Sequence, residues 1–223
     1  MRLQLCGVLA FLLMAGIAVA QQGNNDQAEP RLLRFDFTPL IGYRTGMSFT
    51  SEPQVQPLVA GSNPRLAFDA SPSYGFAFGV RLNEQDLVEF RWARQDTYFH
   101  VEGVAKNSSR QRVVLDQFHG DFTHEYFVED WSQRVRPFVV GSAGATHVSA
   151  SASNSFTRFS FGLGGGIKFF ATQHFGFKLQ AQWLPIWVTP EVTAFVCGAG
   201  CVVRVGGTLS SQGEVTIGPV LRF

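Results

Sequence analysis

The sequence is poor in charged residues. Asp, Glu, Lys and Arg make up 16% of its 223 residues, against roughly 25% in ordinary soluble domains. The formal net charge is +1, and no segment concentrates Lys and Arg into a basic stripe. This composition argues against a nucleic-acid partner. We also expect no bound metal, and no cofactor, since the one glycine-rich stretch that superficially resembles a phosphate loop, at 162–166, lacks that loop's Lys-Ser/Thr pair.

Long apolar runs are also missing beyond the N-terminus. No uninterrupted apolar run of 18 residues follows Ala20, which argues against a helical membrane protein. Before it, Arg2 and the apolar run 5–20 end in Ala-Val-Ala, the pattern of a signal-peptidase site. We predict a signal peptide at 1–20, a periplasmic lead-in at 21–32 and one domain at 33–223. The alternative is a retained N-terminal anchor, for which the run is short.

Cysteine is scarce, with three residues in the whole chain. Cys6 lies inside the predicted signal peptide, so Cys197 and Cys201 are the cysteines expected in the exported protein. An oxidising compartment favours a disulfide between them. The alternatives are a metal site, which needs more ligands, and a redox pair, which usually has two intervening residues where this sequence has three.

Aromatic residues are abundant, at 13% of the chain with 22 Phe, and they recur at every second position. Phe159, Phe161 and Leu163 alternate with Ser160 and Gly162, for example. Since successive side chains of a strand point to opposite faces, this alternation predicts strands with one apolar and one polar or small face. Eight segments show it: 35–44, 74–82, 88–93, 118–126, 136–148, 158–169, 175–183 and 214–223.

The connections between these segments alternate in length. Short links at 83–85, 129–131 and 171–173 alternate with long links at 46–71, 95–112, 149–157 and 189–212. Outer-membrane barrels have short periplasmic turns and longer outer loops. The sequence thus predicts an all-β, eight-stranded antiparallel up-and-down transmembrane β-barrel. The alternative is a soluble β-sandwich, in which the Phe rows would face a shared interior. Aromatic girdle residues are expected at Tyr43, Tyr74, Trp92, Trp183 and Trp187.

The last strand, Val215 to Phe223, and the hairpin 161–180 resemble the OmpA-type and OmpX-type family of small outer-membrane barrels, over about 33–223. The resemblance implies that Ile217, Leu221 and Phe223 form the assembly signal read by the barrel-assembly machinery. It also implies a location in the bacterial outer membrane. The chain ends at Phe223, so we expect no peptidoglycan-binding domain and no tethering to the cell wall.

Charged residues lie on the polar face of the predicted strands, where they would point into the lumen. Buried charges need partners, so we predict layers of salt bridges that plug the barrel. A narrow pore is the alternative, and an acid-base or ligand group at His119, Asp121 and Glu125 is another. The predicted lumen charges are Asp36, Arg81, Glu89, Arg91, Asp121, Glu125, Lys168, Lys178, Glu214 and Arg222.

One pair has the spacing of a catalytic group. His147 and Ser149 share a face of the fifth predicted strand, and His-x-Ser is similar to the arrangement in barrel lipid A deacylases. A nucleophilic Ser needs a base, and that base needs an acidic partner. The family has Asn directly after the Ser, whereas Ala150 follows here.

The favoured prediction is therefore a non-enzymatic, monomeric barrel whose surface loops serve envelope integrity, adhesion or an unidentified extracellular ligand. Its expected partners are outer-membrane lipid, lipopolysaccharide and the barrel-assembly machinery.

Overall fold

The computed structural model describes residues 35–50, 65–102, 110–127, 134–150, 155–187, 194–197, 201–204 and 209–223. The predicted signal peptide and lead-in lie outside the described residues. Within the described ranges, no helix is long and apolar enough to cross a membrane.

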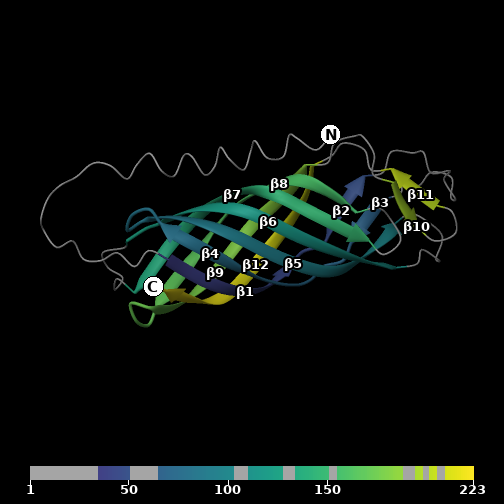
Figure 1. Cartoon of the computed structure of the whole chain (residues 1–223). Coiled ribbons are helices and arrows are strands. Elements are labelled where there is room, and N and C mark those ends of the chain that lie inside the picture. The colour runs from purple at the N-terminus through teal and green to yellow at the C-terminus, as the bar shows by residue number, and fades with distance from the viewer. Residues whose placement is uncertain are drawn as a thin grey trace, which may run out of the picture. The chain divides into compact units, whose positions relative to one another are not determined.

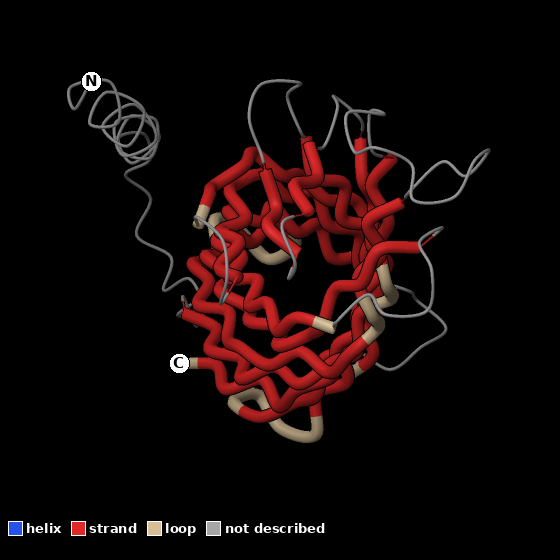
Figure 2. The backbone as a smooth tube through the Cα atoms, turned by 90° about the vertical axis from the view of Figure 1, so that its right-hand side faces the viewer, coloured by secondary structure: helices blue, strands red, loops and turns tan. Residues whose placement is uncertain are grey.

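Eight long strands close into one antiparallel barrel (Figures 1 and 2). Their order around the wall is β5-β4-β1-β12-β9-β8-β7-β6, and pairing of β5 with β6 closes the ring. The predicted all-β, eight-stranded fold is confirmed. The barrel strands are β1 (Phe35–Arg44), β4 (Ser71–Arg81), β5 (Asp86–Glu102), β6 (Gln111–Glu125), β7 (Val135–Ala150), β8 (Phe156–Phe170), β9 (Phe175–Trp187) and β12 (Leu209–Arg222).

Four short strands lie in the long connections. β2 (Met47–Thr50) and β3 (Arg65–Phe68) form a hairpin within the 46–71 link, and β3 pairs with the end of β5, from Phe68 opposite Phe99 to Arg65 opposite Glu102. β10 (Ala194–Cys197) and β11 (Cys201–Arg204) form a separate two-stranded sheet within the 189–212 link. The β2–β3 hairpin thus extends the barrel wall alongside the C-terminal part of β5.

The third and fourth strands are longer than the sequence predicts. Most of the predicted 95–112 loop is strand, because β5 continues to Glu102 and β6 begins at Gln111. The alternation of apolar and polar positions is interrupted after Trp92, because Arg94 and Asp96 face outward and Gln95 and Thr97 face the interior. A segment that is polar on both faces, as 94–97 is, lacks the contrast from which the prediction was made.

The barrel has two different ends. The end that holds the β4–β5, β6–β7 and β8–β9 connections and Phe223 is called the turn end, and the opposite end is called the loop end. Local hydrogen bonds close two of the turns. Asn83 Oδ1 accepts from the backbone nitrogens of Gln85 and Asp86 at 2.8 and 2.7 Å, and Thr172 Oγ1 accepts from that of Phe175 at 3.0 Å. These side chains replace backbone partners within the turns.

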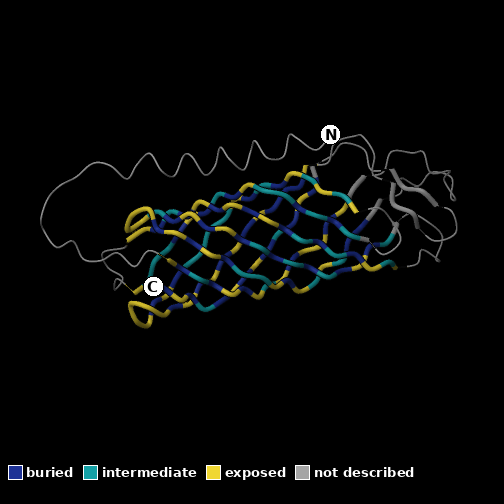
Figure 3. Tube along the Cα trace, viewed as in Figure 1, coloured by how far each residue is buried: buried dark blue, intermediate teal, exposed yellow. Residues whose placement is uncertain are grey.

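Buried and exposed residues alternate along the strands (Figure 3), and the distribution of polar and apolar residues between them is the inverse of that in a soluble protein. The apolar face of the strands is exposed, with Ile41 at 66% and Phe159 at 57%, whereas Asp121 and Lys168 are each 1% exposed. The Phe rows therefore face outward, which shows the sandwich alternative to be wrong. An apolar outer band around a polar interior is the arrangement of a membrane-spanning barrel.

Glycines on the inner face of β8 let large neighbours lean over that strand. A Cβ on Gly164 would lie 2.6 Å from Cγ of Gln182, and one on Gly166 would lie 2.7 Å from Cζ of Phe138. Any larger residue would collide with them. The glycine string thus sets how tightly the interior packs against this part of the wall.

Candidate functional site: the barrel interior

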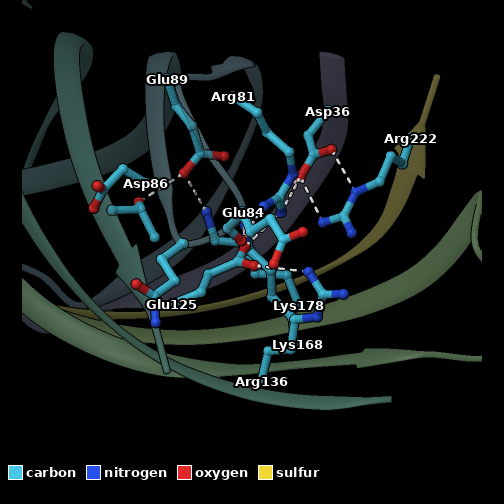
Figure 4. Close-up of polar contacts among 12 residues, drawn as sticks. Asp36, Arg81, Glu84, Asp86, Glu89, Glu125, Arg136, Lys168, Lys178 and Arg222 are labelled. Atoms are coloured by element: carbon cyan, nitrogen blue, oxygen red, sulfur yellow. Dashed lines mark hydrogen bonds and ion pairs between the residues drawn. The ribbon is translucent and has the colours of Figure 1, made fainter. Parts of the chain in front are cut away.

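Buried ion pairs cross the lumen near the turn end (Figure 4). Arg222 binds Asp36 through two bonds, Nε to Oδ1 at 2.9 Å and Nη2 to Oδ2 at 3.1 Å. Arg81 Nη2 donates to Asp36 Oδ2 at 3.2 Å and to Glu125 Oε1 at 2.8 Å. Lys168 Nζ donates to Glu125 Oε1 at 2.7 Å. These five residues come from five different strands, so together they tie the wall across the interior.

A second pair lies beside this group. Lys178 Nζ donates to Glu89 Oε2 at 2.9 Å, and the Thr123 hydroxyl donates to the same oxygen at 3.0 Å. Lys178 is on β9 and Glu89 on β5, which are not neighbours in the wall. We call the two groups the ion-pair layer: Asp36, Arg81, Glu89, Glu125, Lys168, Lys178 and Arg222.

Arg136 and Phe170 border the ion-pair layer at the turn end. Arg136 Nη1 donates to Glu125 Oε2 at 3.3 Å. The guanidinium carbons of Arg136 and Arg222 lie 5.2 and 4.0 Å from the ring centroid of Phe170. A cation above the face of an aromatic ring is attracted to that ring. The Phe170 ring therefore helps to hold the guanidinium groups of Arg136 and Arg222 in place.

Further toward the loop end, three side chains donate hydrogen bonds to the carboxylate of Glu214. Arg44 Nε and Ser73 Oγ donate to Glu214 Oε1 at 2.8 and 2.7 Å, and Arg91 Nη1 donates to Oε2 at 3.1 Å. Arg91 Nε also donates to Asp121 Oδ2 at 2.8 Å. Two cations and two carboxylates thus form a balanced group. With His119, Ser160 and Thr146, described next, they make up the central network.

His119 continues the central network and resembles a catalytic pair at first sight. Its Nε2 lies 2.7 Å from Ser160 Oγ, and its Nδ1 lies 2.9 Å from Arg91 Nη2. Arginine can only donate, so Nδ1 must accept and Nε2 must carry the proton that is donated to Ser160. Thr146 also donates to Ser160 Oγ, at 2.9 Å. A histidine in this tautomer cannot accept the proton of Ser160, so this geometry does not make His119 a base for Ser160.

Toward the loop end many of the buried side chains are apolar. Phe68 and Phe99 pack with ring centroids 6.0 Å apart, and neighbouring strands add aliphatic side chains, all buried at 5% exposure or less. We call this group the apolar ceiling: Met47, Phe68, Phe99, Val113, Leu115, Val148, Leu184 and Ile186. The sequence analysis did not predict it, because Met47, Phe68 and Phe99 lie in segments predicted to be links, and Leu184 and Ile186 lie beyond the end of the predicted strand 175–183.

All ten predicted lumen charges lie in the interior, with exposures from 0 to 8%. Arg44, at 0% exposure, belongs with them. It sits on the same face as Asp36 but at the last position of its strand, where the pattern alone does not separate lumen from rim. The interior contacts of Ser73, His119 and Ser160 were also not predicted, because they connect strands far apart in the sequence.

His147 and Ser149 lie on the outward face of β7 at the loop end, away from the lumen. Asp116 is opposite His147 in the β6–β7 register. The hydrogen bond of His147 is made by Nδ1 with Thr157 Oγ1, at 2.8 Å. A triad would instead use Nδ1 to bind the acidic residue. The geometry therefore places an acid nearby without forming the contact that would orient the base.

The two remaining predicted groups lie near the chain's end. Cys197 and Cys201 are register partners across β10–β11, but their side chains lie outside the described residues, so the disulfide stays a prediction. Ile217, Leu221 and Phe223 all face outward and are 42 to 56% exposed. Phe223 is bonded through its backbone to Phe35, with N···O distances of 2.9 and 3.0 Å. That pairing joins the first and last strands at the turn end.

Several solved structures have the same architecture. Neisserial surface protein A matches with a TM-score of 0.54 and 10% identity, covering 84% of this chain and 97% of that one. OprG from Pseudomonas aeruginosa matches with a TM-score of 0.54 and 12% identity, covering 85% and 96%. The outer-membrane protein AlkL, determined by solid-state NMR in lipid bilayers, matches with a TM-score of 0.51 and 10% identity, covering 91% and 97%.

No protein-family model and no curated protein matches the sequence. The class of fold is nevertheless plain: the chain is a small transmembrane β-barrel of the kind found in bacterial outer membranes. At these identities the similarity concerns the fold and the OmpA/OmpX-type architecture, and function must be argued from the site.

Proposed function

We propose that this protein is a closed, non-enzymatic barrel of the bacterial outer membrane that presents its loop end at the cell surface, for envelope integrity, adhesion or binding of an extracellular ligand. The observation that carries the proposal is the lumen, which is crossed by buried ion pairs and covered by the apolar ceiling. A lumen filled in this way leaves the loops as the part available for interaction.

The outward face supports a loop end that projects from the membrane. Beyond Trp92, β5 presents Arg94 and Asp96, and Arg112 of β6 donates to Asp96 at 3.1 Å. Charged side chains are costly in hydrocarbon, so these strand ends belong in the headgroup region or outside it. The β2–β3 hairpin extends the same wall.

The proposed orientation of the barrel in the membrane follows from the difference between its turn end and its loop end. Short turns and Phe223 would face the periplasm, where the barrel-assembly machinery acts, and the outward band would contact lipid and lipopolysaccharide. Neisserial surface protein A, similar in fold, is by its name a surface protein. A single closed barrel has no exposed sheet edge, which is consistent with a monomer.

Two measurements test the proposal. Folded barrel extracted from outer membranes should migrate differently on gels before and after boiling. Identical migration, together with a soluble periplasmic form, would overturn the membrane barrel.

Orientation is tested by whole-cell antibody labelling. An epitope inserted after Asn107, in the β5–β6 connection, should be labelled on intact cells. The matched control is the same epitope inserted after Glu84, in the β4–β5 turn, which should be labelled only after lysis. The reverse pattern would contradict surface presentation of the loop end.

A lipid A deacylase remains the second candidate, because Asp116 lies opposite His147 on the outward face of the barrel. Its test is given in the Discussion.

A further inference from the structure

The eight long strands meet at eight seams, and the backbone pairing is not equally complete in all of them. Within the described strands, the register pairs of six seams run without a gap. The β8–β9 seam lacks two pairs, at Phe161 and Gly162. The β1–β12 seam, which joins the first and last strands, lacks three pairs, at residues 38–40 of β1. It therefore has the longest interruption in the described wall.

Two prolines explain the interruption of the β1–β12 seam. Phe35 and Phe223 exchange two backbone bonds, at 2.9 and 3.0 Å. In an antiparallel ladder such bonded pairs recur at every second residue. The register therefore places Pro39 opposite Pro219 at a position where both bonds are expected. Neither proline has an N–H to donate, so both bonds of this pair are missing. We call this position the proline gap.

The proline gap lies on the apolar part of the wall. Ile41 and Ile217, the next bonded pair along the seam, face outward and are 66% and 48% exposed. The strands stay close at the gap, because a Cβ on Gly218 would collide with the Pro39 carbonyl. In hydrocarbon no water replaces a missing backbone partner. This stretch of the seam therefore contributes less to closure of the wall than a complete ladder would.

The same seam loses its ladder toward the loop end. Thr45 N donates to Gly213 O at 2.8 Å, but Gly213 N donates in return to the Thr45 hydroxyl, also at 2.8 Å. Beyond this point β2 pairs with β3 and not with β12. Ser210 Oγ of β12 donates to Ser48 O of β2 at 3.2 Å. Side chains thus take over from the backbone where the first strand continues into β2.

Two buried ion pairs cross the same seam from inside the barrel, one on either side of the proline gap. Asp36 and Arg222 are register partners joined by two bonds, at 2.9 and 3.1 Å (Figure 4). Arg44 and Glu214 are also register partners, with Nε 2.8 Å from Oε1. Breaking a buried ion pair from one side is strongly destabilising. These two pairs therefore hold together strands whose backbone ladder is incomplete.

We propose that the barrel wall opens at the β1–β12 seam, and that the Asp36–Arg222 and Arg44–Glu214 pairs are the latches that keep it shut. This conformational device goes beyond the proposed function, which concerns the closed barrel. Opening separates the first and last strands around the proline gap and lets water reach their backbone, while the seven other seams stay paired. Local openings of this kind need less free energy than global unfolding.

Hydrogen exchange of the full chain in lipid bilayers, followed by solid-state NMR, tests the proposal. Ile41 and Ile217 are register partners beside the proline gap. Phe122 and Gly141 are register partners in the uninterrupted β6–β7 seam. The amides of Ile41 and Ile217 should exchange faster than those of Phe122 and Gly141, because they meet water in the open state. Equal protection of the two pairs would overturn the proposal.

Restoring the missing donors gives a second readout. Pro39→Val combined with Pro219→Val permits both missing bonds, and should slow exchange at Ile41 on the order of tenfold. The matched control is Pro137→Val, because Pro137 lies on β7, outside the seam. It should leave exchange at Ile41 unchanged. Unchanged exchange in the double variant would show that the proline gap does not control opening.

A latch variant separates local opening from general destabilisation. Arg222→Gln removes one latch, whereas Lys178→Gln breaks the pair with Glu89, which joins β9 to β5 and does not cross the seam. Arg222→Gln should speed exchange at Ile41 by a larger factor than at Phe122. Lys178→Gln should show no such preference for Ile41. An equal effect of Arg222→Gln at the two sites would contradict the latch.

Discussion

Lys168 on β8 places Nζ 2.7 Å from Glu125 Oε1 on β6, although β7 lies between these two strands in the barrel wall. Glu125 also accepts from Arg81 of β4 and from Arg136 of β7. One carboxylate thus connects four strands through the interior, where the wall's own backbone bonds connect only neighbours.

Glu125→Gln should therefore destabilise the folded barrel strongly, because Arg81 and Lys168 lose their shared negative charge while buried. Breaking a buried pair from one side costs about 3 to 5 kcal/mol. Urea unfolding in lipid vesicles measures the loss. Asp96→Asn is the matched control, since its partner Arg112 is well exposed and such rim pairs contribute at most about 1 kcal/mol. Equal effects of the two variants would contradict the ion-pair layer as a structural centre.

Phe223→Ala should impair assembly in cells more than the stability of the folded barrel. The side chain is 56% exposed, so little burial is lost, and the backbone bonds to Phe35 remain. Yield of heat-modifiable barrel in outer membranes is compared with the urea midpoint of refolded protein. Leu82→Ala, a similarly exposed apolar residue at the turn end, serves as control and should assemble normally. Normal assembly of Phe223→Ala would argue against the assembly-signal interpretation.

Cys197 and Cys201 should not react with a maleimide reagent until the exported protein has been reduced. As cross-strand partners separated by three residues, they would close a short ring that stabilises the hairpin by about 2 kcal/mol on the chain-entropy estimate. Reduction should leave the gel shift of the barrel unchanged, because β10–β11 form their own sheet. Rapid labelling without reductant would rule the disulfide out.

The purified barrel should show no discrete conductance in planar bilayers. Removing two charges of the ion-pair layer with Glu125→Ala and Arg81→Ala should still give a silent barrel, since the apolar ceiling remains. Adding Leu184→Ser and Ile186→Ser should then permit ion passage. Stepwise currents from the unaltered protein would favour the narrow-pore alternative.

Expression of the chain should leave the acylation of lipid A unchanged, because His147 Nδ1 is bonded to Thr157 and not to an acidic residue. Mass spectrometry of extracted lipid A checks this. Loss of one acyl chain would support the enzyme alternative, provided that His147→Ala and Ser149→Ala each abolish it.

The strand pattern was readable from the sequence because a membrane-spanning barrel solvates its two faces differently. The alternation of Phe159, Phe161 and Leu163 with Ser160 and Gly162 identifies β8 and its lipid-facing side with no tertiary information. The same contrast placed ten charges on the inner face. It failed after Trp92, because both faces of β5 are polar at 94–97.

Which side chains contact each other across the lumen could be learned only from the closed barrel. Which strand faces Glu125 depends on how the eight strands tilt and stagger as they close, and alternation along one strand carries no information about that. For the same reason Arg44, Ser73 and Ser160 entered the site only through the structure. The sequence by itself determined which face of each strand meets lipid, because that depends on local side-chain polarity. The tertiary structure decided which buried charges meet, because that depends on geometry across the barrel.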